Sequence, residues 1–167
     1  HTRTRRQRQM CIRDSVLRMD PGSAFGTGSH PTTRLCLEAL EQQPPSGLRV
    51  ADLGCGSGVL GLAALGLGAR QVLSVDTDSL AVRATTDNAV LNDRSVDALR
   101  VSQGSVEVLA TLLEGQPADL LLCNILAPVI EALAPHFQSV LRPGGRGLLS
   151  GLLVEQAPRL IEVLGSL

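Results

Sequence analysis

Short apolar runs alternate with longer stretches of helical spacing along most of this chain. The runs that predict strands lie at Arg49–Leu53, Gln71–Val75, near Leu99–Ser102, and at Ala118–Cys123 and Gly147–Ser150. The stretches that predict helices run from about Pro31 to Gln43 and over Val59–Gly66, Ser79–Leu91, Pro128–Leu141 and Val154–Leu164. Strands that alternate with helices in this way are typical of βαβ units. The pattern therefore predicts an α/β fold built on a mostly parallel sheet.

Glycine and proline residues mark the ends of these predicted elements. The glycine-rich segment Asp20–Ser29 leads to Pro31, a residue type favoured in the first turn of a helix. Pro44–Gly47 ends that helix, and RPGG at Arg142–Gly145 predicts a turn before the last strand. No repeat or linker interrupts residues 16–167, and 44% of the 167 residues are hydrophobic, so one packed domain is expected.

The segment Val50–Gly58, with the sequence VADLGCGSG, carries the strongest chemical signal. A predicted strand runs into a glycine turn and then into a helix, whose first turn offers unpaired N–H groups to a ligand. The ligand is expected where the strand ends. Asp76 stands 22 residues after Gly54, at the end of the next strand, where a carboxylate can accept hydrogen bonds from both hydroxyls of a ribose.

Two cofactor classes compete for this loop. Dinucleotide-binding enzymes use G-x-G-x-x-G, whereas here the third glycine, Gly58, comes one residue early and Val59 occupies the expected position. The acidic Asp52 before the loop suits S-adenosylmethionine (AdoMet), which has no phosphate, better than it suits the pyrophosphate of NAD. The pattern favours AdoMet, with a nicotinamide or other nucleotide-binding Rossmann enzyme as the alternative. Asp76 argues against a glycine turn that binds nothing.

Composition narrows the function further. Five of the fifteen basic and one of the sixteen acidic residues lie in His1–Ser15, so residues 16–167 have a net charge of −5. An acidic domain with no Trp or Tyr lacks the basic surface and stacking platform that nucleic-acid binding needs, so no direct nucleic-acid partner is expected. No apolar run reaches the roughly 20 residues that span a bilayer. The scattered cysteines and histidines predict no metal site and no disulfide, and favour reduced thiols in a cytoplasmic protein.

The basic segment His1–Ser15 differs in character from the rest of the chain. It has neither the apolar core of a secretory signal nor an amphipathic period. We expect an unstructured tail that is foreign to the domain, with an RNA-binding arm or a targeting segment as alternatives.

Four segments together resemble one enzyme family. They read DPGSAFGTGSHPTT at Asp20–Thr33, DLGCGSG at Asp52–Gly58, VDTD at Val75–Asp78 and CNILA at Cys123–Ala127. Over residues 16–167 the chain resembles the bacterial ribosomal protein L-eleven methyltransferases, the PrmA family. The resemblance implies a Rossmann-like class I fold and AdoMet as cofactor. It also implies methyl transfer to lysine side chains and the N-terminal amine of a large-subunit ribosomal protein.

The resemblance implies roles for five residues. Thr33 is expected to reach the methionine end of AdoMet, and Gly54 and Gly56 to pack against the cofactor. Asp76 is expected to hold the ribose, and Asn124 to lie beside the transferred methyl group.

Plainer interpretations exist for some residues of these segments. The residues alone favour another interpretation of Thr33, as a residue in the first helical turn whose side chain hydrogen-bonds to backbone groups. The alternative for Asn124 is that it caps the turn between the strand and the helix, before Pro128. His30 precedes Pro31 and is interpreted as a helix-entry residue, not as a general base.

The residues after Asn124 bear on the substrate. Ile125–Ala127 contains no aromatic side chain that could stack on a flipped base, which argues against a nucleobase substrate. An amide oxygen can instead accept hydrogens from an amine and orient its lone pair. A lysine near pKa ~10.4 costs ~4.6 kcal/mol to present as its free base at pH 7, and an N-terminal amine near ~7.8 about 1 kcal/mol. Positioning and desolvation of the amine are expected to dominate, without a metal.

The chain also departs from the family pattern. Family members carry an N-terminal substrate-recognition domain, and this fold normally ends with two further strands, so we expect a domain truncated at both ends. An intact cofactor site in such a chain does not guarantee activity. Three hypotheses follow: a protein-amine methyltransferase domain, a non-catalytic AdoMet-binding fragment, and a nucleotide-binding Rossmann enzyme.

Overall fold

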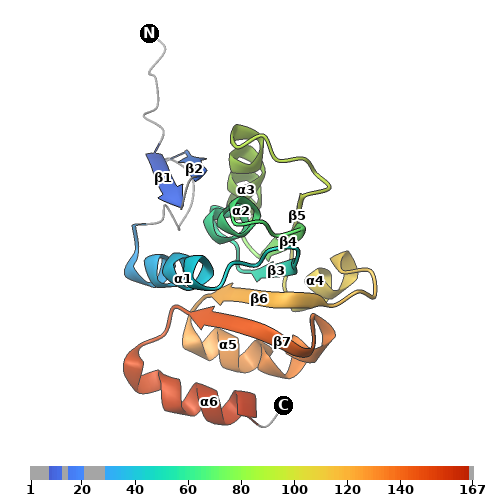
Figure 1. Ribbon diagram of the computed structural model, residues 1–167. Coiled ribbons are helices and arrows are strands. Elements are labelled where there is room, and N and C mark those ends of the chain that lie inside the picture. The colour runs from blue at the N-terminus through green and yellow to red at the C-terminus, as the bar shows by residue number, and fades with distance from the viewer. Residues whose placement is uncertain (1–7, 13–14, 21–28, 166–167) are drawn as a thin grey trace.

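Five parallel strands form the central sheet of the computed structural model, which describes residues 8–12, 15–20 and 29–165 (Figure 1). Across the sheet the order is β5-β4-β3-β6-β7. The strands are β3 (Arg49–Leu53), β4 (Gln71–Asp76), β5 (Leu99–Gln103), β6 (Ala118–Asn124) and β7 (Leu141–Ser150). Because every neighbouring pair in this sheet is parallel, all five carboxyl ends lie along one edge. The predicted α/β fold with a parallel sheet is confirmed.

Helices cover both faces of this sheet. On one face lie α1 (Pro31–Gln42), α2 (Val59–Gly66) and α3 (Ser79–Leu91). On the other lie α4 (Val106–Leu112), α5 (Ala127–Leu133) and α6 (Ala157–Gly165), with the 3-10 turns η1 (Ala134–Ser139) and η2 (Val154–Gln156). Figure 1 shows the resulting three layers.

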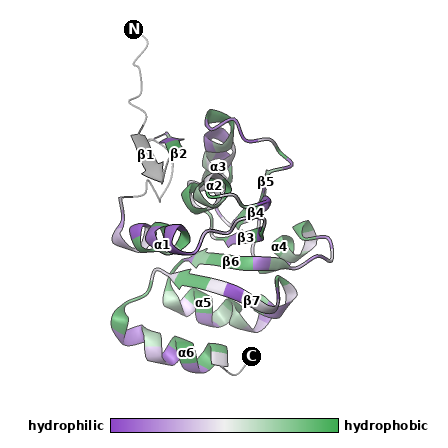
Figure 2. Cartoon of the chain, in the orientation of Figure 1, coloured by the Kyte–Doolittle hydropathy of each residue, from purple (hydrophilic) through white to green (hydrophobic). Residues whose placement is uncertain are grey.

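The core divides in the same way, because successive side chains of a strand point to opposite faces. Val50 packs in the cluster under α1 and α2, whereas Ala51 and Leu53 pack in the cluster under α4 and α5. A strand buried on both faces needs a nearly continuous apolar run. Most of β6 is accordingly hydrophobic in Figure 2.

The sequence predicted α2 and α3 with the bounds that are observed, and the segment after β6 less well. The helix expected over Pro128–Leu141 is split into α5 and η1, and β7 begins at Leu141. Pro135, which has no N–H to donate, stands where the α-helix gives way to the 3-10 turn. The expected turn at Arg142–Gly145 is a register shift inside β7 opposite Ala118–Leu120, with Gly144 at φ +71°. The helix α4 was not predicted.

The N-terminal segment also differs from expectation. Strand β1 (Arg8–Ile12) pairs antiparallel with β2 (Ser15–Met19), so the prediction of an unstructured tail is wrong for residues 8–12. Residues 1–7 and 13–14 lie outside the described residues. Leu17 and Met19 of β2 are buried in the cluster that contains α1 and α2. The foreign origin of the tail stays a prediction.

Two further expectations concern the character of the chain. Cys36, Cys55 and Cys123 are buried free thiols, and burial raises the pKa of Cys123 to about 12. Within the described ranges, none of the helices combines the length and apolar character that crossing a bilayer would require.

Candidate functional site

A cavity of about 720 Å³ opens along the carboxyl edge of the sheet. This volume lies within the range of roughly 300–1,000 Å³ that small-molecule sites occupy. The segments after all five strands contribute to its wall, and so does the start of α1. Each predicted site residue lines it, namely Thr33, Gly54, Gly56, Asp76 and Asn124. The fold therefore brings together residues that lie up to 91 positions apart in the sequence.

The glycine loop between β3 and α2 forms the floor of this cavity. Gly54, Gly56 and Gly58 have φ values of +75°, +56° and +80°, a region in which residues with a Cβ are strained. The backbone N–H groups of Gly54 and Cys55 both donate to the carbonyl of Val75, at 2.9 and 3.1 Å. A Cβ on Gly54 would collide with Cγ2 of Ile125. Both the backbone conformation and the close packing thus require glycine at this position.

Asp76, the last residue of β4, is held by two backbone groups. Its Oδ2 accepts a hydrogen bond from Gly56 N at 2.9 Å, and its Oδ1 accepts one from Asp78 N at 3.0 Å. The carboxylate is therefore fixed against the glycine loop at the wall of the cavity. Since a carboxylate has about four acceptor positions, it can still accept bonds from a ligand's hydroxyls.

Asn124 ends β6 and reaches across to α1. Its Nδ2 donates to Thr33 Oγ1 at 3.3 Å, which links two of the predicted site residues directly. Its Oδ1 is buried and has no hydrogen-bond partner among the described residues. An unpaired buried acceptor is costly, so this oxygen can pair with a donor on a bound molecule when the Asn124 side chain turns it toward the cavity that the residue lines.

Asp52 lies under the glycine loop and also lines the cavity. Burial raises its pKa to about 7, the nearby Asp76 charge adds to the rise, and a hydrogen bond with the Gly61 backbone opposes it. Its Oδ2 has no partner within the described chain, and neither has Ser74 Oγ on the neighbouring strand. The site thus contains a carboxyl group whose charge is sensitive to what binds beside it.

His30 stands at the entry of α1, as the sequence predicted. It is the N-cap residue, and its Nδ1 accepts a hydrogen bond from Thr32 N at 3.4 Å. The ring nitrogen also lies 2.8 Å from Thr32 Oγ1. Although His30 lines the cavity, its polar contacts are those of a capping residue.

Three residues that shape the site were not predicted. Thr85 and Asn88 of α3 donate hydrogen bonds to the carbonyls of Gly56 and Ser57 in the glycine loop, at 3.0 and 2.9 Å. Gly151, which follows β7, has φ +85°, and a Cβ there would collide with the carbonyl of Ile125. Gly151 could have been found from its place after a predicted strand. No sequence signal identifies Thr85 or Asn88, because their role depends on how α3 packs.

The cavity has two chemically different ends. The ends of β3 and β4 supply the carboxylates of Asp52 and Asp76, beside the apolar side chains of Leu53, Val59 and Leu60. The segments after β6 and β7 supply apolar side chains: Ile125, Leu126, Val129, Leu133, Leu152 and Leu153. Asn124 lies between these two ends, because it is the last residue of β6, which has β3 on one side and β7 on the other.

Comparison with known proteins now decides the family. The family model described as "Ribosomal protein L11 methyltransferase (PrmA)" matches residues 4–166. The chain belongs to this family. It is 76% identical over 152 residues to a ribosomal protein L11 methyltransferase of Parasynechococcus marenigrum (strain WH8102), and 70% identical to one of Prochlorococcus marinus (strain MIT 9313). Each alignment covers 91% of this chain, but only 53% and 50% of those relatives. The chain thus spans about half the length of the curated relatives it matches.

Solved structures of PrmA relatives and other methyltransferases share the fold. A ribosomal protein L11 methylase from Lactobacillus delbrueckii subsp. bulgaricus superimposes with a TM-score of 0.74 at 36% identity, over 90% of this chain and 74% of that one. The T. thermophilus 16S rRNA N2 G1207 methyltransferase (RsmC), solved with AdoMet and guanosine, gives 0.73 at 28% identity, over 95% and 46%. The Rossmann-like class I methyltransferase fold expected from the sequence is confirmed.

Proposed function

We propose that this PrmA chain is an AdoMet-dependent methyltransferase domain that acts on amino groups of a large-subunit ribosomal protein. The observation that carries the proposal is the placement of Asn124 Oδ1. This buried oxygen has no hydrogen-bond partner among the described residues, and it belongs to a residue that lines the same cavity as Asp76, between the polar and apolar ends. Membership of the family supports the same activity.

The polar end of the cavity fits the cofactor. Asp76 would hold the ribose hydroxyls, and Gly54 and Gly56 would let the backbone approach the cofactor closely. Thr33, fixed by its contact with Asn124, would reach the methionine end. Asp52 adds a carboxyl group that a positively charged ligand would favour in its ionised form. Among the described residues that line the cavity, His30 in its capping role is the one basic side chain, which suits a cofactor without phosphate better than NAD.

The apolar end fits an amine that has lost its proton. AdoMet supplies a methyl group on a positively charged sulfur, which leaves with the bonding electrons as a nitrogen attacks in line. The attacking amine must be neutral, and the apolar side chains of Leu126, Val129 and Leu153, which are exposed in this structure, would disfavour its protonated form once the bound substrate covers them. Asn124 Oδ1 would accept one amine hydrogen and so direct the nitrogen lone pair toward the methyl group. The proton of the product amine leaves to solvent.

Lysine side chains and an N-terminal amine meet these requirements, whereas a nucleobase does not. Aromatic side chains provide the stacking platform on which a flipped base is best held, with hydrogen bonds to its edge. Here the segment Ile125–Ala127 offers no aromatic ring. We therefore propose a ribosomal protein, and not RNA, as the partner, and the cytoplasm as the place of action.

A methyl-transfer assay tests this function. The chain is incubated with AdoMet labelled in its methyl group and with purified ribosomal protein L11, and the labelled amino groups are mapped by mass spectrometry. Label on lysine or the N-terminal amine supports the proposal. AdoMet binding without transfer to any amine would favour a non-catalytic AdoMet-binding domain. Binding of NAD in place of AdoMet would favour a nucleotide-binding Rossmann enzyme.

A further inference from the structure

One face of α3 carries three polar side chains, Thr85, Asn88 and Asn92. Residues spaced three and four apart lie on the same side of a helix. Thr85 and Asn88 are buried, with 0% and 1% of their surface exposed. Polar side chains at such depth are expensive unless their hydrogen bonds are satisfied, so their partners show what this face of the helix holds.

The first set of partners belongs to the glycine loop of the cavity. Thr85 Oγ1 donates to the carbonyl of Gly56 at 3.0 Å, and Asn88 Nδ2 donates to the carbonyl of Ser57 at 2.9 Å. A Cβ on Gly58 would lie 2.8 Å from Thr85 Cγ2, so the loop is packed tightly against the helix. The face of α3 therefore fixes two successive peptide groups of the loop.

The second set of partners belongs to strand β2, which lies beside α2 and α3 (Figure 1), and to Asp20, the residue that follows the strand. Asn88 Oδ1 accepts a hydrogen bond from Asp20 N at 2.9 Å. Asn92 Oδ1 accepts one from Arg18 N at 2.9 Å, and Asn92 Nδ2 donates to Arg18 O at 2.7 Å. Since β1 occupies one edge of β2, these two amides close the other edge in place of a further strand.

Asn88 is the only residue of the three that touches both sets. Its single planar amide binds Ser57 O on one side and Asp20 N on the other, so a displacement of β2 must tilt the group that supports the loop. Asn92 contacts only β2 and the helix backbone in these bonds, and Thr85 contacts only the loop.

We propose that Asn88 is a positioning residue that couples the docking of β2 to the affinity of the cofactor loop for AdoMet. The coupling rests on the proposed cofactor and adds a second element, outside the cavity wall, on which binding depends. Coupling between two sites is reciprocal, so AdoMet must also stabilise the docked strand.

Hydrogen exchange on the unaltered chain gives the first test. With saturating AdoMet, exchange of the Arg18 and Asp20 amides is expected to slow by about fivefold, at the lower end of typical coupling. NAD at the same concentration serves as the ligand control. AdoMet binding, seen by calorimetry, with no change at these two amides would overturn the coupling and leave the proposed function intact. Absence of AdoMet binding would overturn both.

A double-mutant cycle gives the second test. Asn92→Ala touches no loop atom, yet it is expected to weaken AdoMet binding about fivefold through the bridge. Asn88→Ala alone is expected to weaken AdoMet binding by about tenfold or more. Adding Asn92→Ala to Asn88→Ala is expected to have no further effect on the affinity. Thr85→Val, which removes the loop bonds to Gly56 O and Cys55 Sγ but no bond to β2 or Asp20, is the matched control and should leave the Asn92→Ala effect in place. Unchanged affinity in Asn92→Ala, or additive losses in the double variant, would show that Asn88 is a structural residue only. The exchange test needs no variant and stands if Asn88→Ala fails to fold.

Discussion

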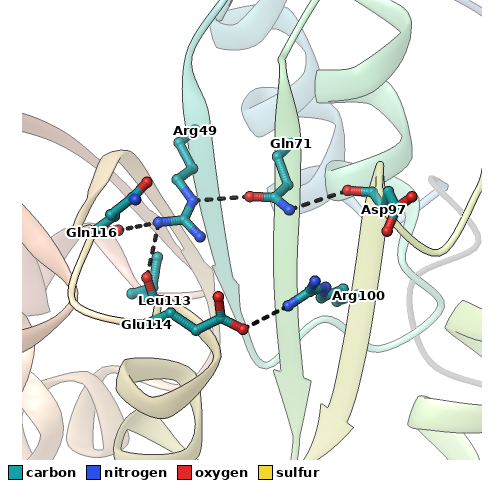
Figure 3. Close-up of polar contacts among 7 residues, drawn as sticks. All are labelled: Arg49, Gln71, Asp97, Arg100, Leu113, Glu114 and Gln116. Carbon is teal, nitrogen blue, oxygen red and sulfur yellow. Dashed lines mark hydrogen bonds and ion pairs between the residues drawn. The ribbon is translucent and has the colours of Figure 1, made fainter.

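The hydrogen bonding of buried polar groups differs between the amino edge of the central sheet, where the strands begin, and the carboxyl edge, where they end. At the amino edge, the side chain of Arg49, which is 6% exposed, is satisfied by its neighbours (Figure 3). It donates to Gln71 Oε1 and to the carbonyl of Leu113, both at 2.9 Å, and also to the carbonyl of Gln116. Gln71 in turn donates to the carbonyl of Asp97 at 3.1 Å. These bonds tie the starts of β3 and β4 to the loops that precede β5 and β6.

The carboxyl edge instead keeps polar atoms without partners. Within the described residues, the buried oxygens Asp52 Oδ2 and Asn124 Oδ1 near this edge lack a hydrogen bond, as do Ser74 Oγ in the middle of β4 and Arg94 Nε in the loop before β5. Each such atom costs stability, which a fold that needed only to be stable would avoid. The contacts of Arg49 therefore hold the fold together, whereas the unpaired oxygens beside the cavity support the proposal that the carboxyl edge binds a ligand. The predictions below separate these two roles.

The largest expected effect is on the pH dependence of the free energy of unfolding, to which Asp52 at the carboxyl edge contributes. Because the pKa of Asp52 is raised from 3.8 to about 7, the folded chain keeps a proton that the unfolded chain releases between these values. The free energy of unfolding should therefore fall as pH rises from about 4 to 7, by up to ~4 kcal/mol from this group. Asp52→Asn should remove that fall, and so be more stable than the unaltered chain at pH 8 but not at pH 4. Urea unfolding at a series of pH values measures it.

Asp119 at the amino edge provides the opposite control. A backbone hydrogen bond from Arg49 and a side-chain bond from Arg142 lower its pKa. Its contribution to stability is therefore present above the ordinary carboxyl pKa and is lost as pH falls. Asp119→Asn should destabilise the chain at pH 7 and lose its effect in acid. Parallel pH profiles for the two variants would contradict the distinction between the edges.

Arg49→Ala should have the next largest effect, on stability alone. It leaves the buried carbonyl of Leu113 and the part-buried carbonyl of Gln116 without their donor, which should cost ~3 kcal/mol. Arg100→Ala removes only the surface ion pair with Glu114 and should cost less than about 1 kcal/mol. Urea unfolding gives the stability, and an AdoMet titration well below the transition gives the affinity. A loss of AdoMet affinity in folded Arg49→Ala would show that the amino edge also serves binding.

Asn124→Ala should slow methyl transfer by about 100-fold, while AdoMet affinity stays within a few-fold. The variant removes the oxygen that is proposed to direct the amine, and the hydrogen bond to Thr33 as well. Ser150→Ala, which removes a 3.4 Å bond to the same end of α1, is the matched control and should transfer methyl groups nearly normally. Single-turnover kinetics separates the steps. If AdoMet affinity collapsed instead, Asn124 would belong to the cofactor site alone.

Asp76→Ala should weaken AdoMet binding by ~1–3 kcal/mol, since it removes a charged acceptor for the ribose hydroxyls. Asp78→Asn removes the same charge two residues away but keeps the oxygen that caps α3 at Leu80 N, so it should bind normally. Calorimetry on both variants makes the comparison. Equal losses would indicate that general electrostatics, and not a specific contact, explains the effect.

Much of the fold was predictable where local signals agree with packing. Glycine turns and apolar periods define β3, α2 and α3, and the carboxyl ends of the strands locate Gly54 and Asp76. Where local signals mislead, tertiary contacts decide. The segment Val106–Leu112 is rich in β-branched and aliphatic residues that do not distinguish helix from strand, yet it packs as α4. The residues of Arg142–Gly145 look like a turn and lie inside β7.

The supporting parts of the site were beyond prediction for a related reason. Asn124 and Thr33 were predicted through a family resemblance, and their hydrogen bond joins elements 91 residues apart. Asn88 and Arg49 acquire their roles only when helix, loop and strand are assembled, and neither stands in a motif. Sequence thus locates the groups that face the ligand better than the groups that hold them in place.

Calorimetric titration of the unaltered chain with AdoMet, and separately with NAD, tests most directly whether the carboxyl edge is a cofactor site. We expect saturable binding of one AdoMet per chain, reduced at least about fivefold in Asp76→Ala, and no heat of binding from NAD at the same concentration. Binding of NAD with equal or greater affinity, or AdoMet binding that Asp76→Ala leaves unchanged, would contradict this expectation.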